Sequence, residues 1–482
     1  MTPCLEPDAE TLKHWLKTIS SLALKHQSET GQAPAMGLVG EEGHRVAEVM
    51  SQPIAESPIE GGIEAVTALL EEARHVALNT TGGGYLAYVP GGGLFPAALA
   101  DLIAGSFNRF TGLSGAAPAF VRFEADVLAW LSKEFGYGPN ARGLFTSGGS
   151  QANLSALVAA RHMHFGDSGD FRKAKVYTSA QAHHSVAKSL RLVGLPKDAM
   201  RTVPVDATMR MSIEALEHMM RSDVAAGYIP MAVVAAAGTT NTGAIDPLEE
   251  IAALCNELDA WLHVDGAYGG AFVLCPEGRR RLKGIERADS ITFDPHKGLF
   301  LPYGTGCLLV KDGRTLREAH DSDAAYLQDF DTFGHGGAPP SPSAYGPELS
   351  RPYRGLRLWL SLMLFGAGAF REALSEKIQL AQHFYDALVQ ADAPIDILHP
   401  PQTSALGFRL RRNEGESLDA WNTRNALWMQ GVNARQRVHL SSTTVSAPEG
   451  QLFTLRVCVL SFRTHEQHIQ HCLEDLLATI PT

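Results

Sequence analysis

The feature that most constrains the fold of this chain is a series of short apolar runs that alternate with helical patterns. Examples are "GLFTS" (143–147), "MAVVAAAG" (231–238), "WLHVD" (261–265) and "GCLLV" (306–310). Turn residues bound these runs, and such near-continuous apolar runs are typical of strands buried on both faces of a parallel sheet. Helices between successive strands would then cover the two faces. We therefore expect a large α/β domain with a mainly parallel sheet over residues 86–360, and ligands at the carboxyl ends of its strands.

The sequence on either side of this region has a different texture. "TLKHWLKTISSLALKHQ" places Leu12, Trp15, Leu16 and Ile19 on one helical face. After about residue 360 a long helical pattern leads into strand-like segments such as "LGFRL" and "TLRVCVLS". The expected organisation is an N-terminal helical segment (1–85), the large domain (86–360) and a small C-terminal α+β domain (361–482).

Charge and composition exclude several classes of protein. The net charge of −11 argues against a general affinity for nucleic acid or for an anionic membrane. No basic head with an apolar stretch opens the chain, and no window approaches about 20 uninterrupted apolar residues, so we expect neither a signal peptide nor a membrane span. The six cysteines are scattered without metal-like spacing. We therefore expect reduced, structural cysteines in a cytoplasmic protein that has no metal site.

One lysine lies where the pattern indicates the end of a buried strand. Lys297 follows Pro295 and His296 in "ITFDPHKGLF", with apolar residues on both sides. Burial disfavours an ammonium, and a neutral lysine amine is a nucleophile suited to a Schiff base with an aldehyde. A lysine that reaches out to water is the alternative, but the short segment offers it little length.

Three other features follow expected strands. Gly149 and Ser150 in "TSGGSQAN" open a helix whose N–H groups could bind phosphate, although a plain tight turn is the simpler reading. His183 in "SAQAHHSV" could lie flat against a planar ligand or belong to a surface pair. Asp265 ends "WLHVD" and needs a cationic partner if buried. Taken with Lys297, these features are what pyridoxal 5′-phosphate requires, since the lysine holds the aldehyde and the aspartate pairs with the ring nitrogen.

The chain resembles the group II pyridoxal-phosphate-dependent decarboxylases, the family of aromatic L-amino acid, glutamate and histidine decarboxylases. "HVDGAYGG" looks like the family's HVDAAYAG element, and "DPHKGL" looks like its NPHKW lysine motif. "YLAYVPGGGLFPAALADLIAG", "YRGLRLWLSLMLFG" and "LRVCVLSFRTHEQHI" resemble further family segments in the same order along nearly the whole chain. The resemblance implies the fold type I architecture and a homodimer with shared active sites, clasped by the N-terminal helices.

It also implies roles for individual residues. Lys297 would carry the cofactor as a Schiff base, Asp265 would pair with the ring nitrogen, and His183 would stack on the ring and assist protonation. The remaining expected cofactor contacts are Gly149, Ser150, Thr240, Ala267 and His296, and the expected substrate contacts are Tyr88, Pro90 and Phe110.

The implied reaction is decarboxylation of an L-amino acid to the amine and carbon dioxide, with a loop tyrosine returning a proton to the α-carbon. The loop offers Tyr326 and Tyr345, beside Phe330, Phe333 and His335, and Tyr345 is the preferred donor. The spacing of this loop departs from the animal enzymes. Related aldehyde synthases carry phenylalanine in place of the tyrosine, so oxidative conversion to an aldehyde is the main alternative.

Two other departures bear on the substrate. Asp294 replaces the common asparagine before Pro-His-Lys, and Arg109 is introduced in "SFNRFTGLSGAAPAF". If Arg109 pointed into the pocket, an acidic substrate would be plausible; otherwise Tyr88, Phe107, Phe110 and Leu113 would make an apolar pocket for an aromatic ring, which we favour. An aminotransferase is a further alternative, which would require an arginine clamp such as Arg456 or Arg463 on the α-carboxylate.

Overall fold

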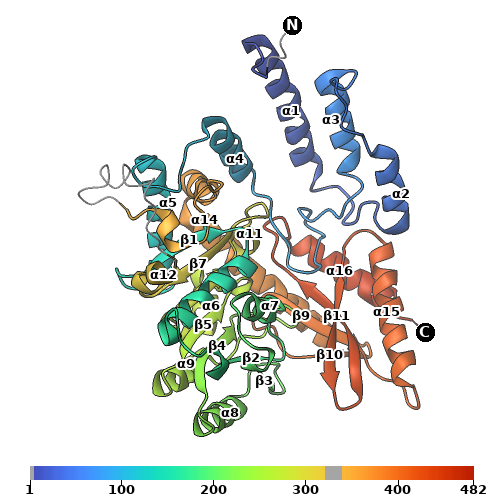
Figure 1. The fold of residues 1–482 in the computed structure, drawn as a ribbon. Coiled ribbons are helices and arrows are strands. Elements are labelled where there is room, and N and C mark those ends of the chain that lie inside the picture. Colours follow the sequence, from blue (N-terminus) through green and yellow to red (C-terminus); the bar gives the residue numbers. More distant parts are fainter. Residues whose placement is uncertain (1–4, 321–338, 482) are drawn as a thin grey trace.

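The computed structural model describes residues 5–320 and 339–481 and confirms the expected α/β architecture (Figure 1). The large domain is built on a seven-stranded sheet with the strand order β1-β7-β6-β5-β4-β2-β3. These strands are β1 (Arg142–Thr146), β2 (Ala174–Ser179), β3 (Met200–Val203), β4 (Ile229–Ala236), β5 (Trp261–Asp265), β6 (Ser290–Phe293) and β7 (Gly306–Val310). The apolar pattern of the sequence did not predict β3, which lies at one edge of the sheet.

The sheet is mainly parallel, as expected. β2 pairs in parallel with β3 and β4, β4 with β5, and β5 with β6. β7 is antiparallel to both of its neighbours, β1 and β6. Because β1 is antiparallel to β7, it runs in the same direction as the parallel strands. The carboxyl ends of β1, β2, β4, β5 and β6 therefore meet at one edge of the sheet.

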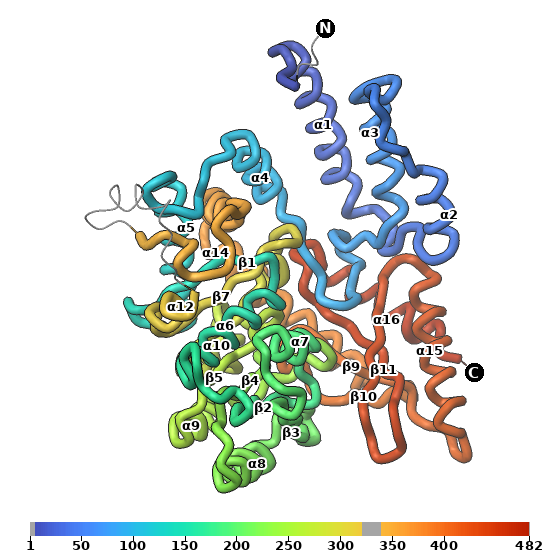
Figure 2. Tube along the Cα trace, viewed as in Figure 1, coloured from blue at the N-terminus to red at the C-terminus, as the bar shows by residue number. Residues whose placement is uncertain are grey.

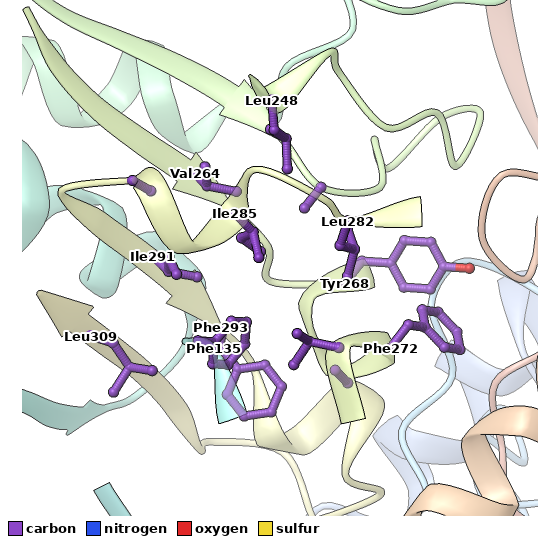
Figure 3. Close-up of a cluster of buried hydrophobic side chains, with 14 of the residues drawn as sticks. Phe135, Leu248, Val264, Tyr268, Phe272, Leu282, Ile285, Ile291, Phe293 and Leu309 are labelled. Atoms are coloured by element: carbon purple, nitrogen blue, oxygen red, sulfur yellow. The ribbon is translucent and has the colours of Figure 1, made fainter. Parts of the chain in front are cut away.

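Successive residues of the central strands enter different cores on the two faces of the sheet. Leu262 and Val264 of β5 belong to a large apolar cluster, which Figure 3 shows with Ile291, Phe293 and Phe135 packed together. Trp261 of the same strand belongs to a second cluster. The helices of this domain are α4 (Phe95–Phe107), α5 (Pro118–Glu134), α6 (Gly149–Phe165), α7 (Ser185–Leu192), α8 (Ile213–Ala225), α9 (Leu248–Glu257), α10 (Pro276–Arg281), α11 (Pro295–Gly298) and α12 (Gly313–His320).

The C-terminal domain has a four-stranded antiparallel sheet in the order β10-β11-β9-β8. Its strands and helices are β8 (Ile395–Ile397), β9 (Ala405–Leu410), α15 (Leu418–Ala434), β10 (Ser441–Ala447), β11 (Gly450–Cys458) and α16 (Glu466–Ala478). The long helix α14 (Gly355–Gln390) joins it to the large domain and contains a break at Gly366, whose φ is 70°. The expected division after residue 360 falls inside this helix.

The N-terminal helices α1 (Ala9–Glu29), α2 (Gly40–Met50) and α3 (Gly62–Ala73) project away from the rest of the chain (Figure 2). α1 begins where the Asp8 side chain accepts a hydrogen bond from the Thr11 N–H, which satisfies one free donor of the first turn. No residue of α1 is buried. α1 packs beside α3, to which Lys25 is joined through Glu71, while its apolar stripe of Leu12, Trp15, Leu16 and Ile19 stays exposed.

No helix of the described part of the chain is long and apolar enough to cross a membrane. Within the same residues, no group of three or more His, Cys, Asp or Glu side chains is arranged to hold a metal ion.

Candidate active site

A cavity of about 300 Å³ lies at the edge of the sheet where five strand ends meet. It contains side chains or backbone from the segments that follow β1, β2, β4, β5 and β6. Every residue expected to contact the cofactor lies in its wall: Gly149, Ser150, His183, Thr240, Asp265, Ala267, His296 and Lys297. The topology therefore brings together groups that are far apart in the sequence.

The turn after β1 forms one end of this cavity. Gly148 and Gly149 lead into α6, and the Thr146 hydroxyl donates to the Gly148 carbonyl at 3.0 Å. A Cβ atom on Gly149 would lie 3.0 Å from both Ala267 Cβ and Asp294 Oδ2, so only glycine leaves this wall open. Because the first N–H groups of a helix lack intrahelical partners, the start of α6 at this wall suits an anionic group such as a phosphate.

Asp265 ends β5 and is held by two hydrogen bonds. The Asn153 amide donates to Asp265 Oδ2 at 2.8 Å, and the Ala267 N–H donates to Asp265 Oδ1 at 3.1 Å. The two oxygens are thus fixed from different directions. A carboxylate held in this way at a cavity wall can pair with a protonated ring nitrogen.

His183, and not its neighbour His184, lies at the cavity. The Ser185 N–H donates to His183 Nδ1 at 3.3 Å, and the Ser185 hydroxyl lies 2.8 Å from the same nitrogen. Because Nδ1 accepts, the proton of the neutral ring is on Nε2. Burial lowers the pKa of His183, an effect opposed by Asp265, so this imidazole is neutral near pH 7.

The segment after β6 supplies the lysine. Lys297 Nζ lies 3.1 Å from Asp294 Oδ2, and His296 Nε2 lies 3.7 Å from that same oxygen. His296 Nδ1 donates to the Thr305 carbonyl at 2.8 Å, and burial lowers the pKa of this histidine. Asp294 is 2% exposed, and its Oδ1 atom has no hydrogen-bond partner. A buried carboxylate oxygen without a partner is costly, so Asp294 is only partly satisfied, through the Lys297 ammonium at its other oxygen.

The expected substrate residues and the expected proton donor lie outside this wall. Tyr88 and Phe110 are 59% and 38% exposed, while Pro90 is buried beside Tyr88. Tyr345 belongs to the second apolar cluster and lines a different cavity, so its position does not support the role of proton donor in its own chain. The other loop candidates, Tyr326, Phe330, Phe333 and His335, lie outside the described residues.

Tyr88 has an unusual backbone conformation that two contacts hold in place. Its φ is 50°, which is uncommon for a residue with a side chain. The Ser441 hydroxyl accepts from the Tyr88 N–H at 2.9 Å, and the Arg456 guanidinium donates to the Tyr88 carbonyl. Such strain persists only where surrounding contacts impose it, and it is frequent at functional sites.

The two C-terminal arginines are engaged with backbone carbonyls. Arg456 donates to Tyr88 and, at 3.2 Å, to Asn241, while Arg463 donates to Thr81 at 3.2 Å and to Gly92 at 2.7 Å. Neither arginine lines the cavity. Their positions therefore give no support to a carboxylate clamp of the kind that an aminotransferase would need.

Sequence reasoning did not assign a role to several polar residues of the wall, among them Asn153, Ser185 and Thr239. Asn153 lies one helical turn after Gly149, so the period of α6 was a usable signal for it. Nothing in the local sequence distinguishes Ser185 or Thr239 from ordinary turn residues.

Comparison with known proteins settles the family. The sequence profile described as "Pyridoxal-dependent decarboxylase conserved domain" matches residues 68–411. The chain belongs to the pyridoxal-dependent decarboxylase family. It is a pyridoxal-phosphate-dependent carboxy-lyase that acts on an amino acid.

Individual members of the family resemble most of the chain. An aromatic-L-amino-acid decarboxylase of Bacillus atrophaeus is 35% identical over 82% of this chain and 80% of its own. An L-2,4-diaminobutyrate decarboxylase of Acinetobacter baumannii is 29% identical over 79% of this chain and 76% of its own. The crystal structure of Oryza sativa TDC with PLP and tryptamine superposes with a TM-score of 0.89, at 25% identity and over 99% of each chain.

The residues of the cavity fit the cofactor of this decarboxylase family. The Lys297 amine suits the aldehyde of the cofactor, and the Asp265 carboxylate, held by two hydrogen bonds, suits its ring nitrogen. The glycine turn at the start of α6 leaves room for its phosphate. Asp294 is the exception, because a second carboxylate in the wall opposes an anionic ligand.

Proposed function

We propose that this chain decarboxylates an aromatic L-amino acid to the amine and carbon dioxide in the strand-end cavity. The observation that carries the proposal is the convergence of Lys297, Asp265 and His183 on one cavity whose far end is an open glycine turn. Lys297 would hold the cofactor covalently, and the N–H groups from Gly149 and Ser150 would hold its phosphate. Thr240, Ala267 and His296 complete the wall around these groups.

When bound, the cofactor supplies the electron sink for the bond that breaks between the α-carbon and the carboxylate. The chain's own contribution is to hold charge and move protons. Asp265 stabilises positive charge opposite its carboxylate, which the hydrogen bonds from Asn153 and Ala267 keep in one orientation. His183, with its proton on Nε2, would deliver a proton toward the α-carbon after carbon dioxide leaves.

Exposed aromatic side chains support an aromatic substrate. Tyr88, in the segment before α4, and Phe107 and Phe110, at and just after its C-terminal end, are 59%, 51% and 38% exposed. Arg109 is exposed and absent from the cavity wall, so it provides no site for an acidic side chain within its own chain. The B. atrophaeus relative and the rice structure point to the same class of substrate.

We also propose a homodimer that completes the substrate side of each site. α1 exposes Leu12, Trp15, Leu16 and Ile19 at 40–54% and buries no residue. Further large apolar side chains are exposed on α4 and α14: Leu99, Leu102, Ile103, Phe107, Met363, Leu364 and Phe365. Apolar surface of this extent marks a protein interface, and a second copy would cover it while bringing Tyr88 or Phe110 to a cavity.

A cytoplasmic location fits the cysteines. The described ones, Cys255, Cys275, Cys307, Cys458 and Cys472, are all buried and free. Burial raises the pKa of each of these thiols, which keeps it unreactive in a reducing compartment.

A panel of amino acids tests this function. Purified protein with added cofactor is given L-tryptophan, L-tyrosine, L-DOPA, L-glutamate and L-2,4-diaminobutyrate, and carbon dioxide, amine, aldehyde and peroxide are measured. We expect carbon dioxide and the matching amine in equal amounts from an aromatic substrate, without peroxide. Aldehyde with peroxide would identify an aldehyde synthase instead, and turnover of glutamate or diaminobutyrate alone would refute the aromatic preference.

A further inference from the structure

A chain of buried polar side chains runs from the far end of β5 to Asp265. Trp261, His263 and Asp265 occupy alternate positions of β5, so their side chains point to the same face of the sheet. In the register of β5 with β6, His263 lies opposite Ser290. Asn153 approaches from α6. His263 and Ser290 are 0% exposed and Asn153 is 1% exposed, so none of these polar groups can rely on water.

The distances show a continuous set of hydrogen bonds. Trp261 Nε1 donates to Ser290 Oγ at 2.8 Å, and Ser290 Oγ lies 2.8 Å from His263 Nδ1. His263 Nε2 lies 3.1 Å from Asn153 Oδ1, and Asn153 Nδ2 donates to Asp265 Oδ2 at 2.8 Å. The Thr292 hydroxyl lies 3.4 Å from His263 Nε2 and can share that proton.

Donor and acceptor rules give these bonds one direction. A carboxylate only accepts, so the Asn153 NH₂ group must face Asp265, which turns the Asn153 carbonyl toward His263. His263 Nε2 must therefore carry the proton, and Nδ1 accepts from the Ser290 hydroxyl. The Trp261 N–H in turn donates to Ser290. Each donor in this series of four side chains therefore points toward Asp265, and aligned hydrogen bonds of this kind polarise and strengthen one another.

Asn153 also connects the aspartate with the stacking histidine. Its second N–H donates to Ser185 Oγ at 3.0 Å. The Ser185 hydroxyl is then free to donate to His183 Nδ1, 2.8 Å away. One buried amide thereby orients both Asp265 and His183.

We propose that Trp261, Ser290, His263 and Asn153 form a directional hydrogen-bond relay that positions Asp265 and stabilises its negative charge against the ring nitrogen of the cofactor. In this role they are positioning residues for the decarboxylation. The relay rests on the proposed pairing of Asp265 with that nitrogen. Each donor withdrawn from the relay leaves the carboxylate less stabilised, so the shared proton moves from the ring nitrogen toward Asp265 and the electron sink weakens. The lowered pKa of His263, about 4 and caused mainly by burial, agrees with a neutral imidazole that donates through Nε2.

The test compares Asn153→Leu, His263→Phe, Ser290→Ala and Trp261→Phe. Each variant is loaded with cofactor labelled with ¹⁵N at the ring nitrogen, whose NMR shift reports protonation without turnover, and kcat, KM and Tm are measured in parallel. We expect the ¹⁵N signal to move toward the unprotonated value. The loss of kcat should be about tenfold or more for Asn153→Leu and His263→Phe. It should be about threefold for Ser290→Ala and about twofold for Trp261→Phe. The KM of each variant should stay within about twofold of the unmodified enzyme.

This order distinguishes the relay from a packing role. Trp261→Phe removes the most volume, so a purely structural role would make it the worst variant in Tm and kcat together with an unmoved ¹⁵N signal, and that result would overturn the proposal. His263→Gln retains a donor toward Asn153 and should recover part of the ¹⁵N shift. The matched control is His399→Phe, because His399 is buried, bonds the Pro400 carbonyl and lies away from the cavity. If His263→Phe fails to fold, Ser290→Ala tests the same link with a small change.

Asp265→Asn separates the failure of the relay from the failure of the proposed function. An inactive Asp265→Asn beside an unchanged ¹⁵N signal and kcat in His263→Phe and Ser290→Ala would overturn the relay alone. A fully active Asp265→Asn would refute the proposed role of Asp265 itself.

Discussion

Replacing Asp294 by asparagine should tighten cofactor binding, because the wall of the cavity carries one negative charge too many. The wall contains two carboxylates, Asp265 and Asp294, against one lysine, Lys297, while burial lowers the pKa of both His183 and His296 and so favours their neutral forms. The negative charge of a ligand's phosphate is therefore repelled by the excess negative charge of the wall. Asp294 Oδ2 lies 3.0 Å from where a Cβ of Gly149 would be, so the carboxylate borders the turn expected to hold the phosphate.

The size of the effect follows from Coulomb's law. Two unit charges about 5 Å apart repel by about 3 kcal/mol at an effective dielectric constant of about 20. Lys297, 3.1 Å from Asp294 Oδ2 and 22% exposed, offsets part of this repulsion. We therefore expect Asp294→Asn to gain about 1.4 kcal/mol, which is a roughly tenfold lower Kd for pyridoxal 5′-phosphate.

The assay compares two ligands that differ in the phosphate alone. Kd is measured by absorbance for pyridoxal 5′-phosphate and for pyridoxal, in the natural chain and in Asp294→Asn. The tenfold gain should be confined to the phosphorylated ligand. Asp289→Asn is the matched control, since Asp289 lies at the opposite end of β6, away from the cavity. An equal gain with pyridoxal, or no gain with either ligand, would refute the electrostatic reasoning.

Lys297→Ala should remove the absorbance near about 420 nm and the adduct trapped by borohydride; an unchanged adduct would place the covalent link elsewhere. Tyr326→Phe should divert product from amine to aldehyde and peroxide, whereas Tyr345→Phe should leave the product ratio unchanged because Tyr345 lies in an apolar core; the reverse pattern would restore Tyr345 as the donor. Arg351→Met should lower the free energy of unfolding, measured by urea denaturation, by about 3–5 kcal/mol. It leaves Glu124, which lies 2.7 Å from Arg351 and is 2% exposed, as an unpaired buried charge, so adding Glu124→Gln should recover part of the loss. The Tm should fall as the pH drops from 7 toward 5. Burial lowers the pKa of nine described histidines, so below about pH 6.5 the unfolded chain takes up protons that the folded chain does not, and a Tm that stays flat would contradict this. These histidines are His26, His164, His183, His263, His296, His320, His399, His439 and His468.

Local sequence was most informative where a strand ends in a charged or small residue. Lys297, Asp265 and Gly149 could be singled out because a charge or a glycine turn interrupts an apolar run, and the rule that ligands gather at parallel strand ends then joined them. The assignment of strands succeeded for the same reason, because buried parallel strands are nearly uniform in apolarity. The edge strand β3 was missed because its burial is incomplete and its sequence lacks that uniformity.

The relay shows the opposite case. His263 sits in an apolar run and reads as an isolated core histidine, and Asn153 reads as an ordinary helical residue. Their connection depends on the alternation of β5, on the register with β6 and on the angle at which α6 crosses the sheet. The sequence also could not place Tyr345, since a tyrosine near a long loop can turn to either side, and in the fold it joins the apolar cluster that contains Leu144.

The sequence by itself therefore determined the class of fold, the cofactor and the residues at each strand end, because burial and turn chemistry are local properties that repeat with the period of a strand or helix. The tertiary structure alone decided which of those residues share a cavity and that Asp294 is left with an unpartnered oxygen. It also decided that Tyr345 points into a core and that a polar relay stands behind Asp265. These outcomes depend on contacts between segments far apart in the chain, which no local pattern encodes.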